Sequence, residues 1–421
     1  MRSLPAVVID RVALLAAGPV IVYLALFHGA AATAAAVAIA FAVIVWPRPD
    51  VALLMLLGLV PVIAVVHSGG SPLYVTVVGG VGLLLVRLTL NGLRARLELL
   101  LILLMACAVT LSCLLPPESL RIEHQWKGCA LMLAGLGMLA ASMLAPPDPR
   151  RIAQLVGGAG AGVAGYLLAR GEYASGRLTG LGLNPNYVGA VLALALVATI
   201  GLARFHRTWV WLGPAVVCTS ALVETRSRGA FLMAAVGLAG VLLAGRPVRY
   251  KVLIALALIV ATQALPEALD SVQGDLTGSR TSTELTANTE VRKQAAALAL
   301  RVALDHPLRG IGYGLFPEYA RTSSTLGIYI DTHNDYLRLA AETGSVTLAL
   351  LVALLWLGLV RRYAADHSIL QSLCAAFAVG LLFANALTSF VVSTPFWISL
   401  GCLMGHAAHR KKDPSPLPST T

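Results

Sequence analysis

Residues 187–203 read Tyr-Val-Gly-Ala-Val-Leu-Ala-Leu-Ala-Leu-Val-Ala-Thr-Ile-Gly-Leu-Ala, a run of apolar and small side chains that carries no charge. The polar turn Asn184-Pro185-Asn186 precedes this run, and Arg204 follows it. A helix of this length rises ~25 Å, which approaches the ~30 Å thickness of the hydrocarbon core of a bilayer. The run therefore predicts a membrane-spanning helix.

Apolar runs of the same kind recur along most of the chain. Several of them are shorter than the ~20 residues that a perpendicular span needs, so some are expected to be half-helices or to merge with their neighbours. The pattern predicts 12 to 14 spans, at about 12–27, 30–46, 51–66, 73–86, 97–115, 129–144, 152–168, 187–203, 209–223, 229–244, 252–264, 345–360, 370–390 and 395–406.

The composition supports an all-α, polytopic integral membrane protein. Of 421 residues, 58% are hydrophobic and only 12% are charged, against about 25% charged in a typical soluble domain. The 39 Gly and 21 Pro are tolerated better in membrane helices than in soluble ones. The net charge of +11 first suggests nucleic acid, but the apolar excess argues that the basic residues set topology instead. We therefore expect membrane lipids and no nucleic acid as partners.

Basic residues are unevenly distributed between the two sets of loops. If the loops alternate from a cytoplasmic N-terminus, 18 of the 31 Lys and Arg fall on the cytoplasmic side, six in the short loops opposite and seven in one long polar segment. Long loops cross the membrane largely regardless of charge, so the informative comparison is 18 against six. The positive-inside rule then places both termini in the cytoplasm and the long segment outside.

The sequence divides into four regions on this basis. Residues 1–264 are predicted as spans with short loops, 265–336 as a large external loop, 337–410 as C-terminal spans and 411–421 as a disordered tail. Within the loop, the pattern predicts a helix over 290–304 that ends at Asp305-His306-Pro307, followed by the Gly-rich turn 310–314. The N-terminal apolar run is interpreted as an uncleaved span rather than a removed signal peptide. Six dispersed cysteines form neither a disulfide framework nor a CxxC metal site.

Two external segments carry polar residues next to predicted spans. Residues 177–187 contain Arg177 and the Gly- and Asn-rich turn that ends in Asn186. Irregular backbone of this kind lies at membrane depth only where it is buried in protein or lines a wet cavity; a turn capped by Asn186 is the simpler interpretation. In residues 224–229, Arg226 and Arg228 lie on the side that the topological bias disfavours. Their position fits either side chains that snorkel to the membrane interface or a clamp for phosphate groups. Residues two positions apart on a helix do not share a face, so only one of the two arginines would face a site.

The other two segments lie in and after the large loop. Arg292 begins an Ala-rich helical stretch, where a solvated helix face would explain it equally well. His333 lies among Asp331, Asn334 and Asp335. A histidine in a loop is often structural, but a neighbouring carboxylate could orient this imidazole and raise its basicity.

Taken in order, these segments resemble the bacterial O-antigen ligase and polymerase superfamily. Each motif is weak alone, but their ordered combination is fairly specific, and it covers the chain from about residue 177 to 344. The motifs are Arg177 with Gly182-Leu183-Asn184-Pro185-Asn186, Ser227-Arg228-Gly229, Arg292 before an Ala-rich helix, His306-Pro307-Leu308-x-Gly310-x-Gly312, and His333-Asn334-Asp335-Tyr336-Leu337 with Glu342-x-Gly344.

The resemblance implies a metal-independent, inverting glycosyltransferase without a cofactor, acting at the periplasmic face of the inner membrane. Its donor would be a glycan on undecaprenyl pyrophosphate, and in the ligases the acceptor is a sugar of the lipid A core. Arg228 and Arg292 match the essential arginines of the family and would bind pyrophosphate, as would Arg177. His333 matches its proposed general base. We assign supporting positions to Asn186, Arg226, Asn334, Asp335 and Arg338.

Three alternative functions remain open from the sequence. An O-antigen polymerase or a protein O-oligosaccharyltransferase would share this chemistry and differ in acceptor; one external loop of about 70 residues, with no added soluble domain, favours the ligase. A lipid-linked glycan transporter would use discontinuous helices, for which Gly79-Gly80 and residues 157–160 are candidates. Transporters usually hold ionisable residues near the midplane, however, and the first 170 residues have almost none within predicted spans.

Overall fold

The computed structural model describes residues 48–67, 71–90, 97–115, 125–269, 282–361 and 363–410, and these residues are mostly helical. The predicted spans at 12–27 and 30–46 and the predicted tail at 411–421 lie outside this part of the chain. Each of the other twelve apolar runs falls on helix over most of its length. In the first part of the chain the elements are α3 (Pro49–His67), α4 (Ser71–Leu90), α5 (Leu97–Leu114), α6 (Gln125–Leu144), α7 (Pro149–Arg170), β1 (Tyr173–Ala174), β2 (Arg177–Leu178) and α8 (Pro185–His206).

The second part contains the shorter helices that surround the polar residues. In chain order these are η2 (Trp209–Trp211), α9 (Leu212–Thr225), α10 (Arg228–Leu242), α11 (Val248–Leu269), α13 (Ser282–Asp305), α14 (Phe316–Thr322), α15 (Asp335–Thr343), α16 (Ser345–Leu359), α17 (Ala365–Gly380) and α18 (Phe390–Arg410).

Side-chain caps set the starts of several of these helices. Asp148 accepts a hydrogen bond from Arg150 N at 2.9 Å at the start of α7, and Ser227 caps α10 through Ala230 N. The cap of α8 is Asn184, and the prediction that Asn186 caps this turn is wrong. Pro185 fits the first helical position, where no N–H is needed, so the capping position falls on the residue before it.

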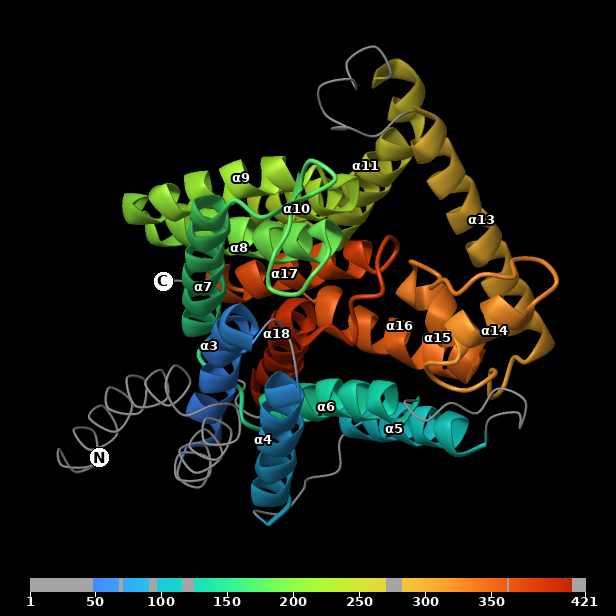
Figure 1. Ribbon diagram of the computed structural model, residues 1–421. Coiled ribbons are helices and arrows are strands. Elements are labelled where there is room, and N and C mark those ends of the chain that lie inside the picture. Colours follow the sequence, from blue (N-terminus) through green and yellow to red (C-terminus); the bar gives the residue numbers. More distant parts are fainter. Residues whose placement is uncertain are drawn as a thin grey trace.

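The helices pack in layers. In Figure 1, α8, α9 and α10 form an upper layer and α5 and α6 a lower one, with α17 and α18 between them and α13, α14 and α15 at one end. The most extensive contacts join α6 to α18, α10 to α17 and α7 to α8. Small residues allow this close approach: a Cβ added at Gly405 of α18 would lie 2.5 Å from Met143 O of α6. One large apolar cluster runs through the interior.

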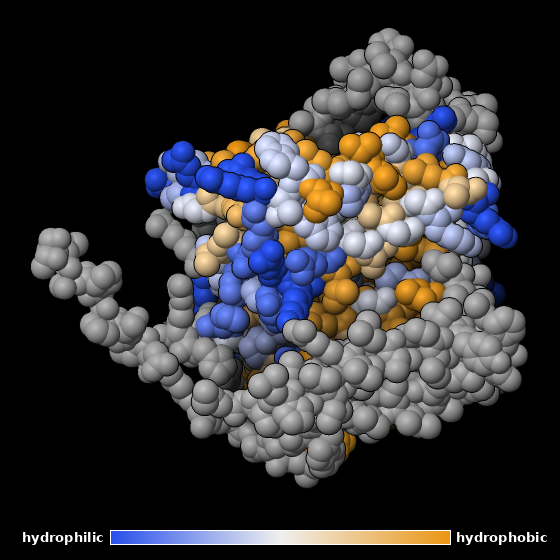
Figure 2. Space-filling model, turned by 90° about the vertical axis from the view of Figure 1, so that its left-hand side faces the viewer, coloured by the Kyte–Doolittle hydropathy of each residue, from blue (hydrophilic) through white to orange (hydrophobic). Residues whose placement is uncertain are grey.

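Four helices in the described part of the chain are long and apolar enough to cross a membrane: Leu97–Leu114, Trp126–Leu144, Pro149–Arg170 and Pro185–His206. Six shorter apolar helices accompany them, among them Arg228–Leu242 and Ser345–Leu359. Along α5, large apolar side chains such as Leu100, Leu103 and Leu111 are exposed, as on a helix that faces lipid. Figure 2 shows one face, where hydrophilic surface gathers beside apolar surface.

The structure differs from the sequence prediction in four places. The loop helix α13 begins at Ser282, eight residues before the predicted start at 290. A two-stranded hairpin, β1 paired with β2, lies in the otherwise helical chain. The predicted loop boundary at 336 falls inside α15, and the following span begins at Ser345. Finally, residues 381–389, inside the predicted span 370–390, separate α17 from α18 and are largely non-helical.

The packing of α7 on α8 can be tested with two glycines on adjacent parts of one helix. A Cβ at Gly160 would overlap the Cβ of Ala195, whereas a Cβ at Gly158 meets nothing within 4 Å. Gly160→Leu is expected to destabilise the protein by about 1–3 kcal/mol through overpacking, and to lower its unfolding temperature in detergent. Gly158→Leu is the matched control and should not lower it. Equal unfolding temperatures would contradict this interface.

Candidate functional site

Arg177 joins the hairpin to the start of α8 and to the α9–α10 junction. Its Nε donates to Thr225 O at 2.8 Å and its Nη2 to Asn186 Oδ1 at 2.7 Å. Ser227 Oγ donates to the same Asn186 oxygen at 3.2 Å. Thr225 and Ser227 are buried. The structure thus brings together the two predicted residues Arg177 and Asn186, and both hold the wall from which α10 begins.

Arg226 and Arg228 flank the sharp turn between α9 and α10. Arg226 has left-handed backbone, with φ 47°, and its N–H donates to Val223 O at the end of α9. Arg228 is the first residue of α10 and is exposed. The start of α10 therefore combines the positive end of the helix dipole with the charge of Arg228, and both favour an anion.

His333 lies in a tightly fixed turn before α15. Asn334 caps this helix by accepting from Tyr336 N at 3.0 Å and Leu337 N at 3.1 Å. Asn334 N in turn donates to Thr332 Oγ1 at 3.2 Å. His333 itself has left-handed backbone, with φ 52°, and is half-buried. A non-glycine residue in this conformation costs of order 1 kcal/mol and persists only where its surroundings enforce it.

Arg292 of α13 acts on the His333 imidazole. Burial is the main cause that lowers the pKa of His333 below its usual 6.5, the positive charge of Arg292 lowers it further, and Asp331 opposes both. The pKa shift means that the imidazole is neutral at pH 7 and able to accept a proton. Two predicted site residues that are 41 positions apart in sequence are thus brought close enough for electrostatic coupling.

Asn385, in the non-helical segment after α17, connects the His333 turn to α8. Its Oδ1 accepts from Thr332 Oγ1 at 3.1 Å and its backbone O accepts from Tyr187 OH at 3.0 Å. The side chain is only 6% exposed. Its Nδ2 is buried and has no hydrogen-bond partner among the described residues. A buried donor left unmade costs about 1–3 kcal/mol, so this amide is a functional candidate.

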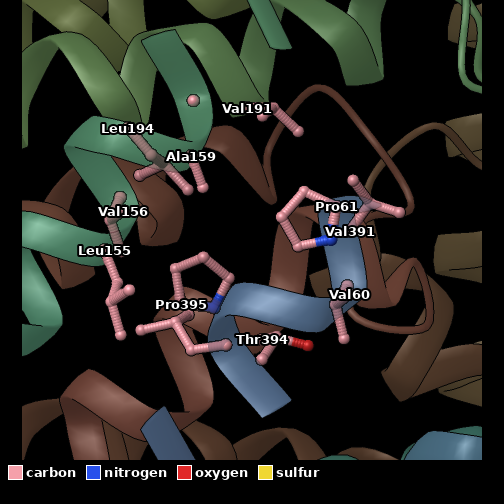
Figure 3. A pocket seen from close by; sticks show the side chains of 12 residues that line it. Val60, Pro61, Leu155, Val156, Ala159, Val191, Leu194, Val391, Thr394 and Pro395 are labelled. Carbon is pink, nitrogen blue, oxygen red and sulfur yellow. The ribbon is translucent and has the colours of Figure 1, made fainter. Parts of the chain in front are cut away.

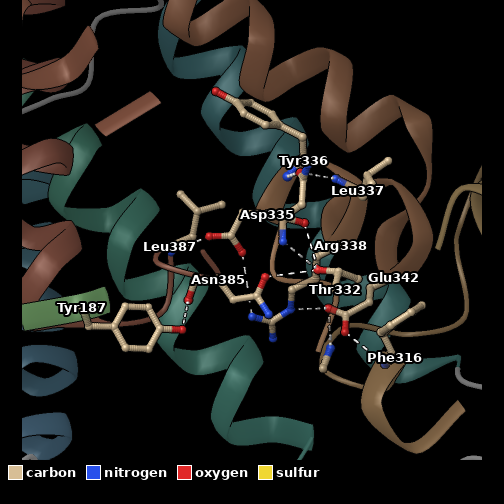
Figure 4. A network of polar contacts seen from close by, with 12 residues as sticks. Tyr187, Phe316, Thr332, Asp335, Tyr336, Leu337, Arg338, Glu342, Asn385 and Leu387 are labelled. Carbon is tan, nitrogen blue, oxygen red and sulfur yellow. Dashed lines mark hydrogen bonds and ion pairs between the residues drawn. The ribbon is translucent and has the colours of Figure 1, made fainter. Parts of the chain in front are cut away.

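Asp335 anchors the start of α15 to the segment 381–389. Its Oδ2 accepts from Leu387 N at 2.8 Å, and its own N–H donates to Leu381 O at 2.8 Å. Arg338 Nη1 lies 3.9 Å from Oδ1. Burial raises the pKa of the Asp335 carboxyl to about 7, although Arg338 and the backbone N–H groups of Leu387 and Ala386 act to lower it. Figure 4 shows this network, with Asp335 and Arg338 at its centre.

Glu342 is fully buried and accepts three hydrogen bonds. The donors are Gly314 N at 2.9 Å, Phe316 N at 3.0 Å and Arg338 Nε at 3.0 Å. The Arg338 guanidinium also lies over the ring of Tyr313, 5.2 Å from its centroid. The carboxylate therefore fixes the Gly-rich turn after α13 and, through Arg338, the helix that follows His333 (Figure 4).

Backbone hydrogen bonds join the motif of residues 306–312 to the motif of residues 342–344, neither of which has a structural role predicted from the sequence. Ile311 N and Gly312 N donate to Ala341 O and Glu342 O at 3.0 and 2.9 Å. Gly310 has φ 65°, and a Cβ there would overlap the Glu342 backbone. Glycine is therefore required, because both the left-handed conformation and the close approach exclude a larger residue.

An apolar pocket lies elsewhere in the helix bundle. Pro61 of α3 and Pro395 of α18 face each other across it, with Leu155 of α7 and Val191 of α8 also in its lining (Figure 3). Thr394 is the only polar residue among the described residues that line it. A pocket of this composition suits hydrocarbon and cannot bind pyrophosphate, so it is not the polar site.

The structure thus groups the predicted site residues into three sets. These are Arg177 with Asn186, Arg292 with His333, and Asp335 with Arg338; Asn334 caps α15, and Arg226 and Arg228 flank the α9–α10 turn. Asn385 is not among the predicted site residues, because the apolar pattern of residues 370–390 predicts one uninterrupted span. Glu342 and Tyr187 lie within the polar segments of the sequence, but neither has a predicted role at the site.

The fold and site define a mostly helical protein with four described helices long and apolar enough to span a membrane, and with a buried polar network. Residues 213–352 match the family model described as O-antigen ligase, which confirms the resemblance to the O-antigen ligase superfamily. The match contains Arg228, Arg292 and His333, whereas Arg177 precedes it and Asn385 follows it. Comparison with curated proteins finds no match.

The buried carboxylate of Glu342 can be tested by truncation. Glu342→Ala leaves two backbone donors and the buried Arg338 without this acceptor. Breaking a buried ion pair in this way costs about 3–5 kcal/mol. We expect a lower unfolding temperature in detergent and faster hydrogen exchange across residues 306–316.

Glu318→Ala is the control, because it removes a partly exposed ion pair with Arg321 in the same loop. Such pairs contribute little to stability. Unchanged exchange across 306–316 in Glu342→Ala would contradict the role of this carboxylate.

Proposed function

We propose that this protein is an O-antigen ligase. It transfers a glycan from undecaprenyl pyrophosphate to a sugar hydroxyl of the lipid A core, with inversion at the anomeric carbon and without a metal ion. The observation that carries the proposal is the electrostatic coupling of Arg292 to the half-buried, neutral His333, inside the segment that matches the O-antigen ligase family. This coupling supports a site in which a base lies near a permanent cation.

In the proposed reaction, His333 accepts the proton of the acceptor hydroxyl as its oxygen bonds to the anomeric carbon of the donor. The bond between that carbon and the phosphate oxygen breaks, and undecaprenyl pyrophosphate leaves with the electron pair. Arg228 and Arg292 neutralise the charge that develops on the leaving group. A guanidinium suits this task because it remains charged in an apolar environment and binds two oxygens at once.

Arg177 has a different place in the proposal. Two of its guanidinium nitrogens donate to Thr225 O and Asn186 Oδ1, so it supports the wall beside Arg228 as well as adding positive charge. Arg226, Asn334, Asp335 and Arg338 position the turns that carry Arg228 and His333. The buried Nδ2 of Asn385 is a further donor for an oxygen of the bound sugar or phosphate.

We place this site at the periplasmic face of the bacterial inner membrane. The excess of basic residues in the opposite loops supports a cytoplasmic location for both termini. In the structure, the start of α8, the end of α9, the start of α10 and the end of α17 all meet the polar network. This arrangement supports alternate crossing by α8, α9 and α10, and the proposal of 12 to 14 spans with a large periplasmic loop extends it to the whole chain.

The acceptor is tested by genetic complementation in a strain that lacks the gene. Loss of the ligase is expected to leave glycan polymer on the undecaprenyl carrier, and wild-type protein should restore polymer-capped lipopolysaccharide. His333→Ala should reduce capping by about 10²- to 10⁴-fold, the usual contribution of a positioned base. Gel analysis of lipopolysaccharide and of carrier-linked glycan measures both effects.

His306 is an exposed histidine directly after α13. His306→Ala therefore serves as the histidine control in the same assay. Single repeats on the core after gene loss would identify a polymerase, and missing protein glycosylation would identify a protein O-oligosaccharyltransferase. If membrane-inserted His333→Ala caps lipopolysaccharide as fully as the wild type does, His333 is not the general base. Glycan transfer by purified protein in detergent excludes transport as the whole function.

The coupling of Arg292 to His333 predicts a pH effect. A base must be unprotonated, so the rate of transfer falls as the pH drops through the pKa of His333, which lies below 6.5. Arg292→Gln removes a charge that lowers this pKa. The acid limb of its residual activity should therefore move to higher pH, measured as initial rates of purified protein in detergent.

Two variants complete this experiment. Arg292→Lys keeps the positive charge and should keep the acid limb near its wild-type position, although its rate falls. Lys293→Gln neutralises the exposed neighbouring residue and should change neither. An unshifted acid limb in Arg292→Gln would refute the coupling.

A further inference from the structure

Three metal-ligating side chains converge on α17 and α18, away from the polar site. They are His367, in the first turn of α17, and Cys402 and His406, near the end of α18. One ligand atom from each lies within 4.8 Å of the other two. Cys402 and His406 are four residues apart, so they share one face of their helix.

This cluster is separate from the site proposed for glycan transfer. The far end of α17 meets the polar network, where Leu381 O accepts from Asp335 N. His367 lies 14 residues before Leu381, which places it roughly 21 Å away along a helical rise of 1.5 Å per residue. On the predicted topology, the cluster lies at the cytoplasmic end of the helices.

The chemistry of the three side chains is that of a zinc site. A thiolate and two imidazoles are the donors that Zn²⁺ prefers, and three protein ligands with an open fourth position are common for this ion. Cys402 is fully buried and the two histidines are half-buried, so the cluster is reachable through the imidazoles. We propose that His367, Cys402 and His406 bind one Zn²⁺ ion, with water as the fourth ligand.

The observed geometry needs little change to accept the ion. Tetrahedral zinc with bonds of 2.0–2.3 Å sets ligand atoms roughly 3.4–3.6 Å apart, against the present limit of 4.8 Å. The imidazoles of His367 and His406 already meet edge to face, with centroids 4.1 Å apart. Tyr363 stacks beside His367 and restricts its orientation. Rotation of side chains is therefore sufficient.

Binding also has a definite proton balance. The Cys402 thiol now donates to Pro147 O, with its Sγ 3.3 Å from that oxygen. Zinc binds the thiolate, so this proton is released to solvent as the Zn–S bond forms. The ion would then cross-link the start of α17 to the end of α18 and stabilise the folded chain in proportion to its occupancy.

Cobalt is the probe for this site. Full-length protein without an affinity tag, purified in detergent and treated with a chelator, is titrated with Co²⁺. We expect one Co²⁺ per chain, the near-ultraviolet absorption of a thiolate–cobalt bond, and its loss when Zn²⁺ is added. Cys402→Ser should abolish this absorption, and His367→Gln or His406→Gln should weaken binding by at least about 100-fold.

Controls distinguish this site from general binding to cysteines or histidines. Cys218→Ser replaces another fully buried cysteine, on α9, and His306→Gln replaces an exposed histidine; both should bind Co²⁺ as the wild type does. Zn²⁺ should raise the unfolding temperature of the wild type but not that of Cys402→Ser. The unfolding transition of Cys402→Ser in the same experiment shows that the variant is folded. Wild-type protein without the thiolate–cobalt absorption, or Cys402→Ser that retains it, would overturn the proposal.

Discussion

The buried carboxylate of Glu342 is the interaction on which the polar end of this protein depends. Its oxygens accept from the backbone of the Gly-rich turn and from Arg338, and no solvent reaches it. A buried carboxylate is costly without such partners. Gly314 belongs to the turn after α13 and Phe316 begins α14, whereas Glu342 and Arg338 both lie on α15, so one carboxylate fixes the Gly-rich turn against this helix. The orientation of α15 in turn fixes the turn that carries His333.

Buried polar groups need hydrogen-bond partners, and this requirement also explains why side chains connect α8, the turn before α15 and residues 381–389. Where helices are short and separated by irregular turns, the freed backbone groups must find partners inside the protein. Asp335 accepts from Leu387 N, and Asn385 links Thr332 to Tyr187. Thr332 and Asp335 are thereby joined to the segment between α17 and α18, and Tyr187 joins that segment to α8. The site is therefore held by the spans around it, although its residues lie on turns.

The sequence predicted the helices well because apolar runs and charge-bearing loops are local patterns. Arg292 and His333 are predicted as site residues from a family resemblance, but their electrostatic coupling depends on how α13 packs against the turn before α15, and no local pattern encodes this. Residues 381–389 were missed for a related reason. Their apolar character resembles a span, whereas Asn385 interrupts it with a polar group whose partners lie 53 and 198 residues away. The predicted cap at Asn186 is wrong for a local reason, because Pro185 fits the first helical position and the cap therefore falls on Asn184.

The positive charges of the site differ in what they can do for a reaction. Arg177 is held by two acceptors, so its charge is largely structural, whereas the charge of Arg292 reaches the imidazole of His333. If Arg292 binds pyrophosphate as proposed, the negative donor offsets that charge and the pKa of His333 rises. A base of higher pKa accepts a proton more readily. Donor binding would thus strengthen the base before the acceptor hydroxyl arrives, so that one arginine couples leaving-group stabilisation to proton transfer.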